Sequence, residues 1–270
     1  MRADVYLVSG GHAKSREAAK RLIESGRVSI DGKSITKPAL DVDETVEHSI
    51  TVAEAADDRF VSRGGLKLEG ALDAFGIDVS GWRAVDIGAS TGGFTDCLLR
   101  RGASRVYAVD SGHGQLDATL LSDPRVVNIE GFNARELSAG ERGVLPQNLD
   151  GAVMDVSFIS QTYILPGIPG LLRQGGVLVS LIKPQFEAGR GAVGKGGIVK
   201  SPRDRLFAVQ RVLDCARSSG FGCIGLMTSP ITGGDGNVEY LVALRLGGED
   251  TFPDRGQVEK IITGGLPWKK

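Results

Sequence analysis

The sequence contains few of the residues that form disulfides and hold metals. Its 270 residues include three cysteines and three histidines, and no two cysteines have C-x-x-C spacing. An odd, unpaired set of cysteines argues against a disulfide framework, and scattered histidines lack the ligand spacing of a zinc site. We therefore expect neither disulfides nor a bound metal.

Long hydrophobic runs and an excess of one charge are also missing. The N-terminus, MRADVY, has no apolar signal core, and the apolar stretch at 177–182 is far too short to span a bilayer. Lys and Arg total 32 against 33 Asp and Glu, so the net charge of −1 gives no global argument for nucleic-acid binding. We expect a cytoplasmic protein without a membrane span, large enough for one or two hydrophobic cores.

A glycine-rich segment, VDIGASTGGFTD at 85–96, predicts a buried strand, a tight turn and the start of a helix. Glycines let the backbone approach a ligand closely, and a helix start presents free N–H groups to it. The segment resembles motif I of S-adenosylmethionine (SAM) methyltransferases, although a glycine turn also occurs in other α/β proteins. The resemblance implies that these residues hold SAM: Asp86, Gly88, Ala89, Ser90, Thr91, Gly92, Gly93 and Phe94.

A second acid follows the next predicted strand. Residues 105–109 are rich in β-branched and apolar side chains, and Asp110 ends the run. In this class of fold, an acid at that position hydrogen-bonds ribose hydroxyls. A strand-end acid can also be a simple helix cap. We interpret Asp110 as part of the same nucleotide pocket.

Residues 1–58 differ in character from the rest of the chain. Ser15 can cap a helix that Gly26 ends, and strands at 27–30 and 33–36 flank an Asp-Gly pair, which favours a type I′ hairpin turn. A third strand is expected at 46–52. Residues 11–37 carry seven bases and three acids, whereas residues 38–58 carry seven acids and no base. The pattern predicts a small α+β domain with one basic face.

That basic face is either an RNA-binding surface or a solvated helix face with pairs such as Glu17 with Arg21. The pattern of residues 13–18, 22–28, 30–32 and 37–38 is similar to the αL-type RNA-binding module of a small-subunit ribosomal protein, pseudouridine synthases and tyrosyl-tRNA synthetases. This resemblance favours RNA. The predicted contacts in this domain are Lys14, Arg16, Lys20, Arg21 and Arg27.

Beyond an expected linker at 59–65, helical and strand patterns alternate through a second domain, residues 66–270. This alternation predicts an α/β fold with a Rossmann-like doubly wound sheet that is mainly parallel and has an antiparallel last strand. The predicted strands are 83–87, 105–109, 125–129, 150–155, 176–182, 221–228 and 239–246.

Four charged residues are expected at the carboxyl edge of this sheet, where such folds bind ligands. Lys67 lies on the helix before the sheet, Asp155 and Lys183 end strands, and Glu239 opens the antiparallel strand. Each one alone is explained by a salt bridge or a cap. Methyl transfer to a ribose hydroxyl, however, needs a general base. Lys183 is the candidate base, backed by Lys67 and oriented by the two acids.

This Lys-Asp-Lys-Glu set looks like that of FtsJ-type ribose 2′-O-methyltransferases. The chain as a whole, including residues 61–68, 88–96, 154–160 and 182–187, resembles the TlyA family, whose members are known as haemolysin A and as rRNA cytidine 2′-O-methyltransferases. The resemblance implies that the four residues are catalytic and that Asp110, Asp155 and, next to the adenine, Asn133 bind SAM. It also implies that the substrate is rRNA within ribosomal subunits.

Residues 189–195 match the G-x-x-x-x-G-K pattern of a phosphate-binding loop. However, Gly196 replaces the Ser or Thr that binds magnesium, and no helix is expected to start there. The loop is instead RNA-contacting or simply solvated. Arg63, Arg190 and Lys195 complete the predicted RNA contacts.

Base methylation is a weaker interpretation of the same fold. Asp155 is followed by Val-Ser-Phe and not by Pro-Pro-aromatic, and no cysteine adjoins a proline. A non-catalytic RNA-binding assembly factor would not need the four charged residues. A membrane-active haemolysin would be expected to have a membrane-spanning stretch, and the sequence has none. Both functions are therefore weaker predictions than ribose methylation.

Overall fold

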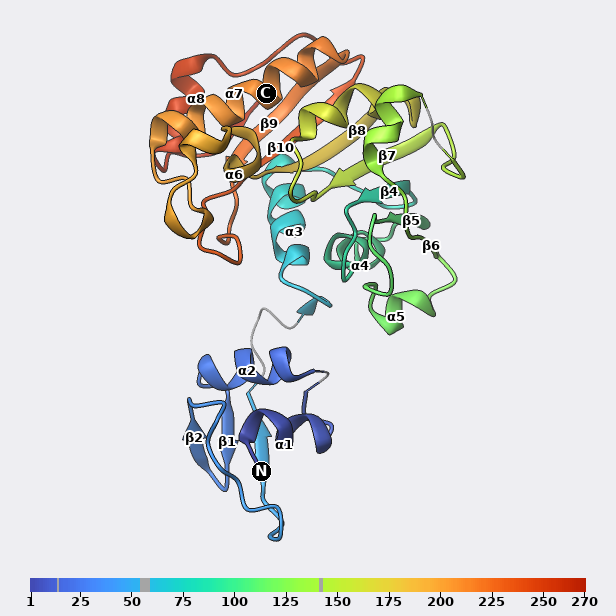
Figure 1. The fold of residues 1–270 in the computed structure, drawn as a ribbon. Helices are drawn as coiled ribbons and strands as arrows, with labels where there is room; N and C mark the ends of the chain where they lie inside the picture. Colours follow the sequence, from blue (N-terminus) through green and yellow to red (C-terminus); the bar gives the residue numbers. More distant parts are fainter. Residues whose placement is uncertain (14, 54–58, 141–142) are drawn as a thin grey trace. The chain divides into compact units, whose positions relative to one another are not determined.

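The computed structural model describes residues 1–13, 15–53, 59–140 and 143–270, and the chain divides into two compact units, Met1–Arg59 and Phe60–Lys270 (Figure 1). Lys14, one of the predicted RNA contacts, lies outside the described residues, as does the side chain of Arg21.

The smaller unit packs two helices on a three-stranded antiparallel sheet of order β2-β1-β3. Asp31 and Gly32 have φ values of 52° and 75°, as a type I′ turn requires, so the predicted hairpin is present. The expected third strand is limited to its last three residues. The elements are α1 (Ala3–Ser9), α2 (Arg16–Glu24), β1 (Val28–Ile30), β2 (Lys33–Ile35) and β3 (Ile50–Val52).

Helix α1 was not predicted from the sequence. It has no side-chain cap at its N-terminus, and its seven residues are too few to establish a periodic pattern. It forms because Ala3 and Leu7 are fully buried in the core that α2 and the sheet complete. Tertiary contacts stabilise this helix.

The larger unit contains an eight-stranded sheet of order β11-β9-β10-β8-β7-β4-β5-β6 (Figure 1). Strands β4 to β8 pair in parallel, and β10 runs antiparallel to both β8 and β9. The strands are β4 (Arg83–Ile87), β5 (Arg105–Val109), β6 (Val126–Ile129), β7 (Leu149–Met154), β8 (Leu172–Ile182), β9 (Phe221–Thr228), β10 (Tyr240–Leu246) and β11 (Trp268–Lys269).

Helices cover both faces of this sheet, because successive strand residues alternate between two apolar clusters. In β8, Leu178 belongs to the cluster with α7 and α8, and Val179 to the cluster with α3 and α4. The helices are α3 (Gly64–Phe75), α4 (Gly93–Arg100), α5 (Ala118–Leu121), α6 (Pro184–Glu187), α7 (Pro202–Ser218) and α8 (Arg255–Ile262), with short 3₁₀ turns at 134–139, 161–163, 165–170, 190–192 and 195–197.

The doubly wound sheet with its antiparallel strand confirms the predicted fold, with differences at the edges. Phe60 is buried and Gly64 begins α3, so residues 60–65, expected as a linker, are part of the larger unit. The two-residue strand β11 was missed, because nothing in so short a segment signals a strand. None of the described helices is long and apolar enough to cross a membrane.

Candidate active site

Asp155 and Lys183 are brought together by two parallel strands. In β7 and β8, Met154 is in register with Ser180, so the residues that follow each strand emerge at the same edge of the sheet. The Lys183 Nζ atom lies 2.6 Å from Asp155 Oδ1 and donates a hydrogen bond of 2.8 Å to Ser157 Oγ. The lysine is thereby held by two groups from the segment that follows β7.

Lys67 and Glu239 form a second pair at this edge. Lys67 lies in the first turn of α3, and Glu239 directly precedes β10, in which Tyr240 is opposite Ile182 of β8. Continuing this register by one residue puts Glu239 beside Lys183. Lys67 Nζ donates to Glu239 Oε2 at 2.6 Å, and the two side chains are only 10% and 3% exposed. The antiparallel direction of β10 is what delivers Glu239 to this edge.

The lysines of both pairs, together with Glu239, line a cavity of about 330 Å³. The structure therefore brings the four predicted side chains together as two lysine–carboxylate pairs whose formal charges cancel. The other lining residues are Ser157, Phe158, Gln185, Phe186, Val193, Gly197, Gly234 and Asp235.

Phe158 is an unusual lining residue that the sequence analysis did not single out. It has a positive φ of 64° and is 92% exposed, although a bulky residue rarely adopts that backbone conformation. Its ring lies 5.3 Å from that of Phe186, with the planes tilted by 51°. An aromatic residue three positions after a strand-end acid was the available sequence signal. Only the backbone shows that its ring is held in solvent at the cavity.

The glycine turn lies between β4 and α4, next to the same edge. Gly88 has a φ of 83°, and a Cβ atom there would lie 2.6 Å from the carbonyl oxygen of Asp155. Gly92 has a φ of 94°, and its Cβ would lie 2.2 Å from the side chain of Leu120. Both positions therefore need glycine, one because the segment directly after β7 approaches so closely and one because α5 does.

Asp110 shapes this turn. Its two carboxylate oxygens accept hydrogen bonds of 2.8 Å from the backbone N–H groups of Ser90 and Gly112. A carboxylate has about four acceptor sites, so about two remain for hydroxyl donors. Ser90 and Thr91 are exposed at the turn, whereas Ala89 and Gly93 are buried.

Three further residues predicted to touch SAM, Asp86, Phe94 and Asn133, are also engaged within the protein. Asp86 is fully buried, accepts from Thr95 Oγ1 at 2.7 Å, and has an Oδ1 atom with no hydrogen-bond partner among the described residues. Burial raises the pKa of Asp86 to about 7. Phe94 is buried in the core, and exposed Asn133 caps a 3₁₀ turn by accepting from Arg135 N. Direct contact of these side chains with SAM stays a prediction.

Several predicted RNA contacts of the smaller unit are engaged locally. Arg16 lies 3.2 Å from buried Asp4, whose pKa is lowered to about 2 by its hydrogen bonds with arginine side chains. Lys20 pairs with Glu17 at 2.8 Å, the same acid that the sequence offered as a partner for Arg21 on a solvated face.

The remaining predicted RNA contacts are Arg27 in the smaller unit and three residues in the larger unit. Arg27 donates to the carbonyl oxygen of Ala53 at 2.8 Å. In the larger unit, Arg63, Arg190 and Lys195 are exposed.

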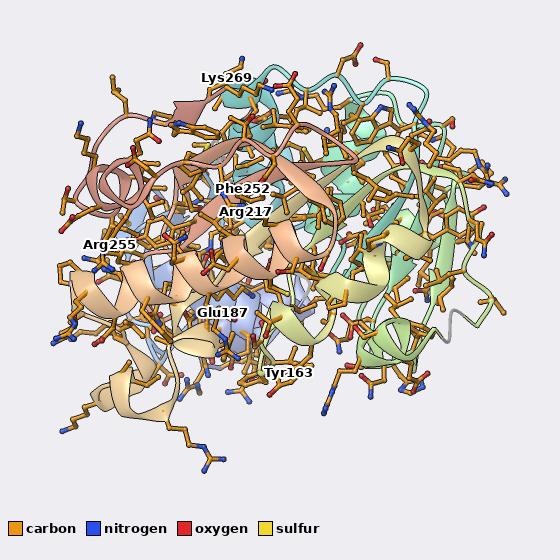
Figure 2. All side chains as sticks on the ribbon, turned by 90° about the horizontal axis from the view of Figure 1, so that it is seen from above. Tyr163, Glu187, Arg217, Phe252, Arg255 and Lys269 are labelled. Carbon is orange, nitrogen blue, oxygen red and sulfur yellow. The ribbon has the colours of Figure 1, made fainter. Side chains whose placement is uncertain are left out.

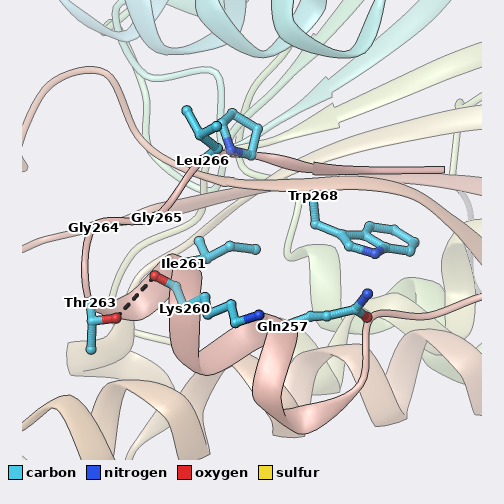
Figure 3. Close-up of a pocket in the computed structure, with 9 residues that line it drawn as sticks. Gln257, Lys260, Ile261, Thr263, Gly264, Gly265, Leu266 and Trp268 are labelled. Carbon is cyan, nitrogen blue, oxygen red and sulfur yellow. Dashed lines mark hydrogen bonds between the residues drawn. The ribbon is translucent and has the colours of Figure 1, made fainter.

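A larger cavity, of about 560 Å³, lies between α8 and β11, with Trp268 and Gln257 on its wall (Figure 3). Lys260 is the one charged side chain among its described lining residues, and the wall includes no predicted site residue. The clustered charges therefore identify the smaller cavity as the candidate active site.

Comparison with known proteins agrees with this geometry. Residues 60–246 match the FtsJ-like methyltransferase family, and residues 1–47 match the S4 domain. The 16S/23S rRNA (cytidine-2′-O)-methyltransferase TlyA of Mycobacterium tuberculosis is 46% identical over 244 residues, which cover 90% of this chain and 89% of that protein. This chain belongs to the TlyA family.

Other TlyA-like proteins agree over similar lengths. Hemolysin A of Brachyspira hyodysenteriae is 43% identical over 246 residues, which cover 89% of this chain and 98% of that protein. A solved structure from Streptococcus thermophilus is 38% identical, with a TM-score of 0.76, and covers 97% of this chain and 94% of its own. The predicted TlyA resemblance, with an FtsJ-like domain after a small N-terminal module, is confirmed.

Proposed function

We propose that this TlyA-family protein transfers a methyl group from SAM to the ribose 2′-hydroxyl of a cytidine in rRNA. The observation that carries the proposal is the double lysine–carboxylate arrangement at one cavity, directly beside the glycine turn. The activity in the name of the Mycobacterium tuberculosis relative supports it.

The residues of the glycine turn fit SAM. Gly88 leaves the turn without a side chain where Asp155 approaches, Asp110 keeps free acceptor sites for ribose hydroxyls, and Asp86 Oδ1 is a buried oxygen without a partner among the described residues. When bound, SAM supplies an electrophilic methyl group. These residues would bind it and orient it toward the cavity.

Within the cavity, the uncharged amine form of Lys183 would accept the proton of the 2′-hydroxyl. Asp155 and Ser157 fix its Nζ atom, so the base does not have to be ordered when the substrate arrives. Glu239 holds Lys67 in the same way, and the ammonium group of Lys67 would donate to a ribose oxygen. Holding the hydroxyl in line with the methyl group would provide much of the rate acceleration.

Phe158 would contact the base of the target nucleotide. Aromatic faces bind unpaired bases by stacking, worth about 1–3 kcal/mol per base. An exposed ring in a strained backbone, supported by Phe186 at the cavity, fits that task better than a role in the core. The target nucleotide would therefore be read as a single unpaired residue.

Affinity for rRNA would come mainly from basic side chains outside the cavity. The match to the S4 domain and the resemblance of residues 13–38 to RNA-binding modules support RNA contact by the smaller unit. Exposed Arg190, Lys195 and Arg63 would add phosphate contacts near the active site. Ribosomal subunits are the expected partners.

Lys183→Ala tests the proposal, with Lys260→Ala, which removes an exposed lysine of α8, as the matched control. Loss of the base should lower kcat by about 10²- to 10⁴-fold, while calorimetry shows SAM affinity within about twofold of wild type. Tritium transfer from SAM, followed by mapping of alkali-resistant positions in rRNA, measures both rate and product.

An absence of 2′-O-methylation by the wild-type protein on all ribosomal subunits and rRNAs offered would contradict the proposed function and favour a non-catalytic assembly factor. Near-normal turnover of Lys183→Ala would contradict the assigned base.

A further inference from the structure

A buried carboxylate lies behind the cavity. Glu187 ends α6, the short helix that starts directly after Lys183, and is 1% exposed beside α7 (Figure 2). Ser160 Oγ donates to its Oε2 atom at 2.5 Å, and the backbone N–H of Gln161 donates to its Oε1 atom at 2.8 Å. Both donors belong to the segment that follows β7.

This carboxylate belongs to a wider buried network. The side chain of Gln161 donates to the carbonyl oxygen of Leu181 at 2.6 Å and accepts from Ser180 Oγ at 2.7 Å, so it anchors the same segment to β8. Arg211 of α7 donates to the carbonyl oxygen of Glu187 at 3.0 Å. A buried network with these donors and acceptors satisfied specifies one arrangement of the segments that it joins.

The two joined segments carry the active site. Paired residues of β7 and β8 end at Met154 and Ser180, so no ladder of backbone bonds aligns Asp155 with Lys183. Ser160 lies five residues after that aspartate, and Glu187 lies four residues after that lysine. The hydrogen bond between Glu187 and Ser160 therefore joins the two segments beyond the Asp155–Lys183 pair, and the paired residues of β7 and β8 join them before it.

We propose that Glu187 is a positioning residue for methyl transfer, which fixes the segment carrying Asp155 and Ser157 against the segment carrying Lys183. This inference rests on the proposed function. Burial raises the pKa of Glu187, so a carboxylate here has a desolvation cost that a purely apolar contact would avoid. An alignment role accounts for that cost, whereas a contribution to stability alone does not.

Glu187→Gln is the sharpest perturbation, because it keeps the shape and replaces one acceptor oxygen with an NH₂ group that cannot accept from Ser160 or from Gln161 N. The matched control is Asp150→Asn at the opposite end of β7, where the carboxylate accepts from Arg83 N and Arg173 Nε. We expect Glu187→Gln to lower kcat by about 10- to 100-fold with KM values for RNA and SAM within about twofold. Asp150→Asn should leave kcat unchanged.

The double variant Glu187→Gln with Ser160→Ala separates alignment from general damage. If Glu187 acts through Ser160, the double variant should lose little more kcat than Glu187→Gln alone, and Glu187→Asp should recover part of the rate. A kcat within twofold of wild type in Glu187→Gln, or equal losses in Glu187→Gln and Asp150→Asn, would overturn the inference. If Glu187→Gln fails to fold, Glu187→Asp and Ser160→Ala carry the same comparison.

Hydrogen exchange tests the alignment without activity. The amides of residues 155–162 should exchange faster in Glu187→Gln than in wild type and be unchanged in Asp150→Asn. Unchanged exchange in Glu187→Gln would overturn the inference even in a protein that methylates. An inactive wild-type protein with the expected exchange pattern would contradict the proposed function and leave the alignment by Glu187 standing.

Discussion

The Lys67–Glu239 pair should contribute to stability as well as to chemistry, and the two contributions are separable. It joins residues 172 positions apart in the chain, and its side chains are 10% and 3% exposed. Lys67→Met would leave the Glu239 carboxylate buried without its partner. Breaking a buried ion pair from one side costs about 3–5 kcal/mol. We expect the lower end, about 3 kcal/mol, because the cavity reaches both side chains.

Removing both charges should cost far less. Replacing a buried pair with uncharged side chains of similar volume is often neutral, so Lys67→Met combined with Glu239→Gln should unfold within about 1 kcal/mol of wild type. Lys67→Met, Glu239→Gln and the double variant should all lose methyl transfer, because each lacks a group that lines the cavity. Stability and catalysis would then diverge in the double variant.

The two tryptophans make the measurement specific. Trp82 and Trp268 both belong to the larger unit, so their fluorescence during urea or thermal unfolding reports on that unit. A loss of about 3 kcal/mol corresponds to a fall in Tm of roughly 6–12 °C for a domain of this size. A double variant that loses the sum of the two single losses would refute energetic coupling of the pair. Single variants as stable as wild type would refute the assigned burial cost.

Two further predictions concern pH and RNA. The pKa of Asp86 is about 7 in the folded protein against 3.8 in the unfolded chain, so the folded state binds the extra proton between these values and the free energy of unfolding falls as pH rises through that window. Asp86→Asn should therefore gain stability relative to wild type from pH 4 to pH 7 in urea titrations, and a constant difference would contradict the raised pKa. Arg190→Glu combined with Lys195→Glu should weaken rRNA binding and reduce the slope of log affinity against log salt by about 1.5, provided that each side chain contacts a phosphate. Filter binding with an unchanged slope would show that this loop is only solvated.

Local features of the sequence predicted most of the strands and the hairpin turn, because apolar runs and turn residues act within a few positions. The Asp-Gly pair at 31–32 favours one hairpin turn in almost any context, and β4 and β5 have the predicted bounds. Short elements such as α1 and β11 form only because other parts of the chain bury or pair with them. No local pattern marks such elements.

Arg16 illustrates the same limit for charged residues. Its spacing on α2 predicted an exposed basic face, and the side chain is 57% exposed, but the sequence did not predict that its guanidinium group lies 3.2 Å from Asp4 of α1. An ion pair between two helices depends on how they pack, and helix periodicity carries no information on that.

The sequence alone predicted the doubly wound α/β fold, the glycine turn and the four charged residues at one sheet edge, since alternating strands and helices favour parallel strands whose carboxyl ends share an edge. Only the tertiary structure decided that Lys183 pairs with Asp155 and Lys67 with Glu239, that Phe158 is exposed with a positive φ, and that Glu187 is buried behind the site. These features depend on strand register and on contacts between segments that are distant in the chain. Whether a residue is buried or paired depends on the neighbours that the fold brings to it, and residue types and spacings in the sequence do not show those neighbours.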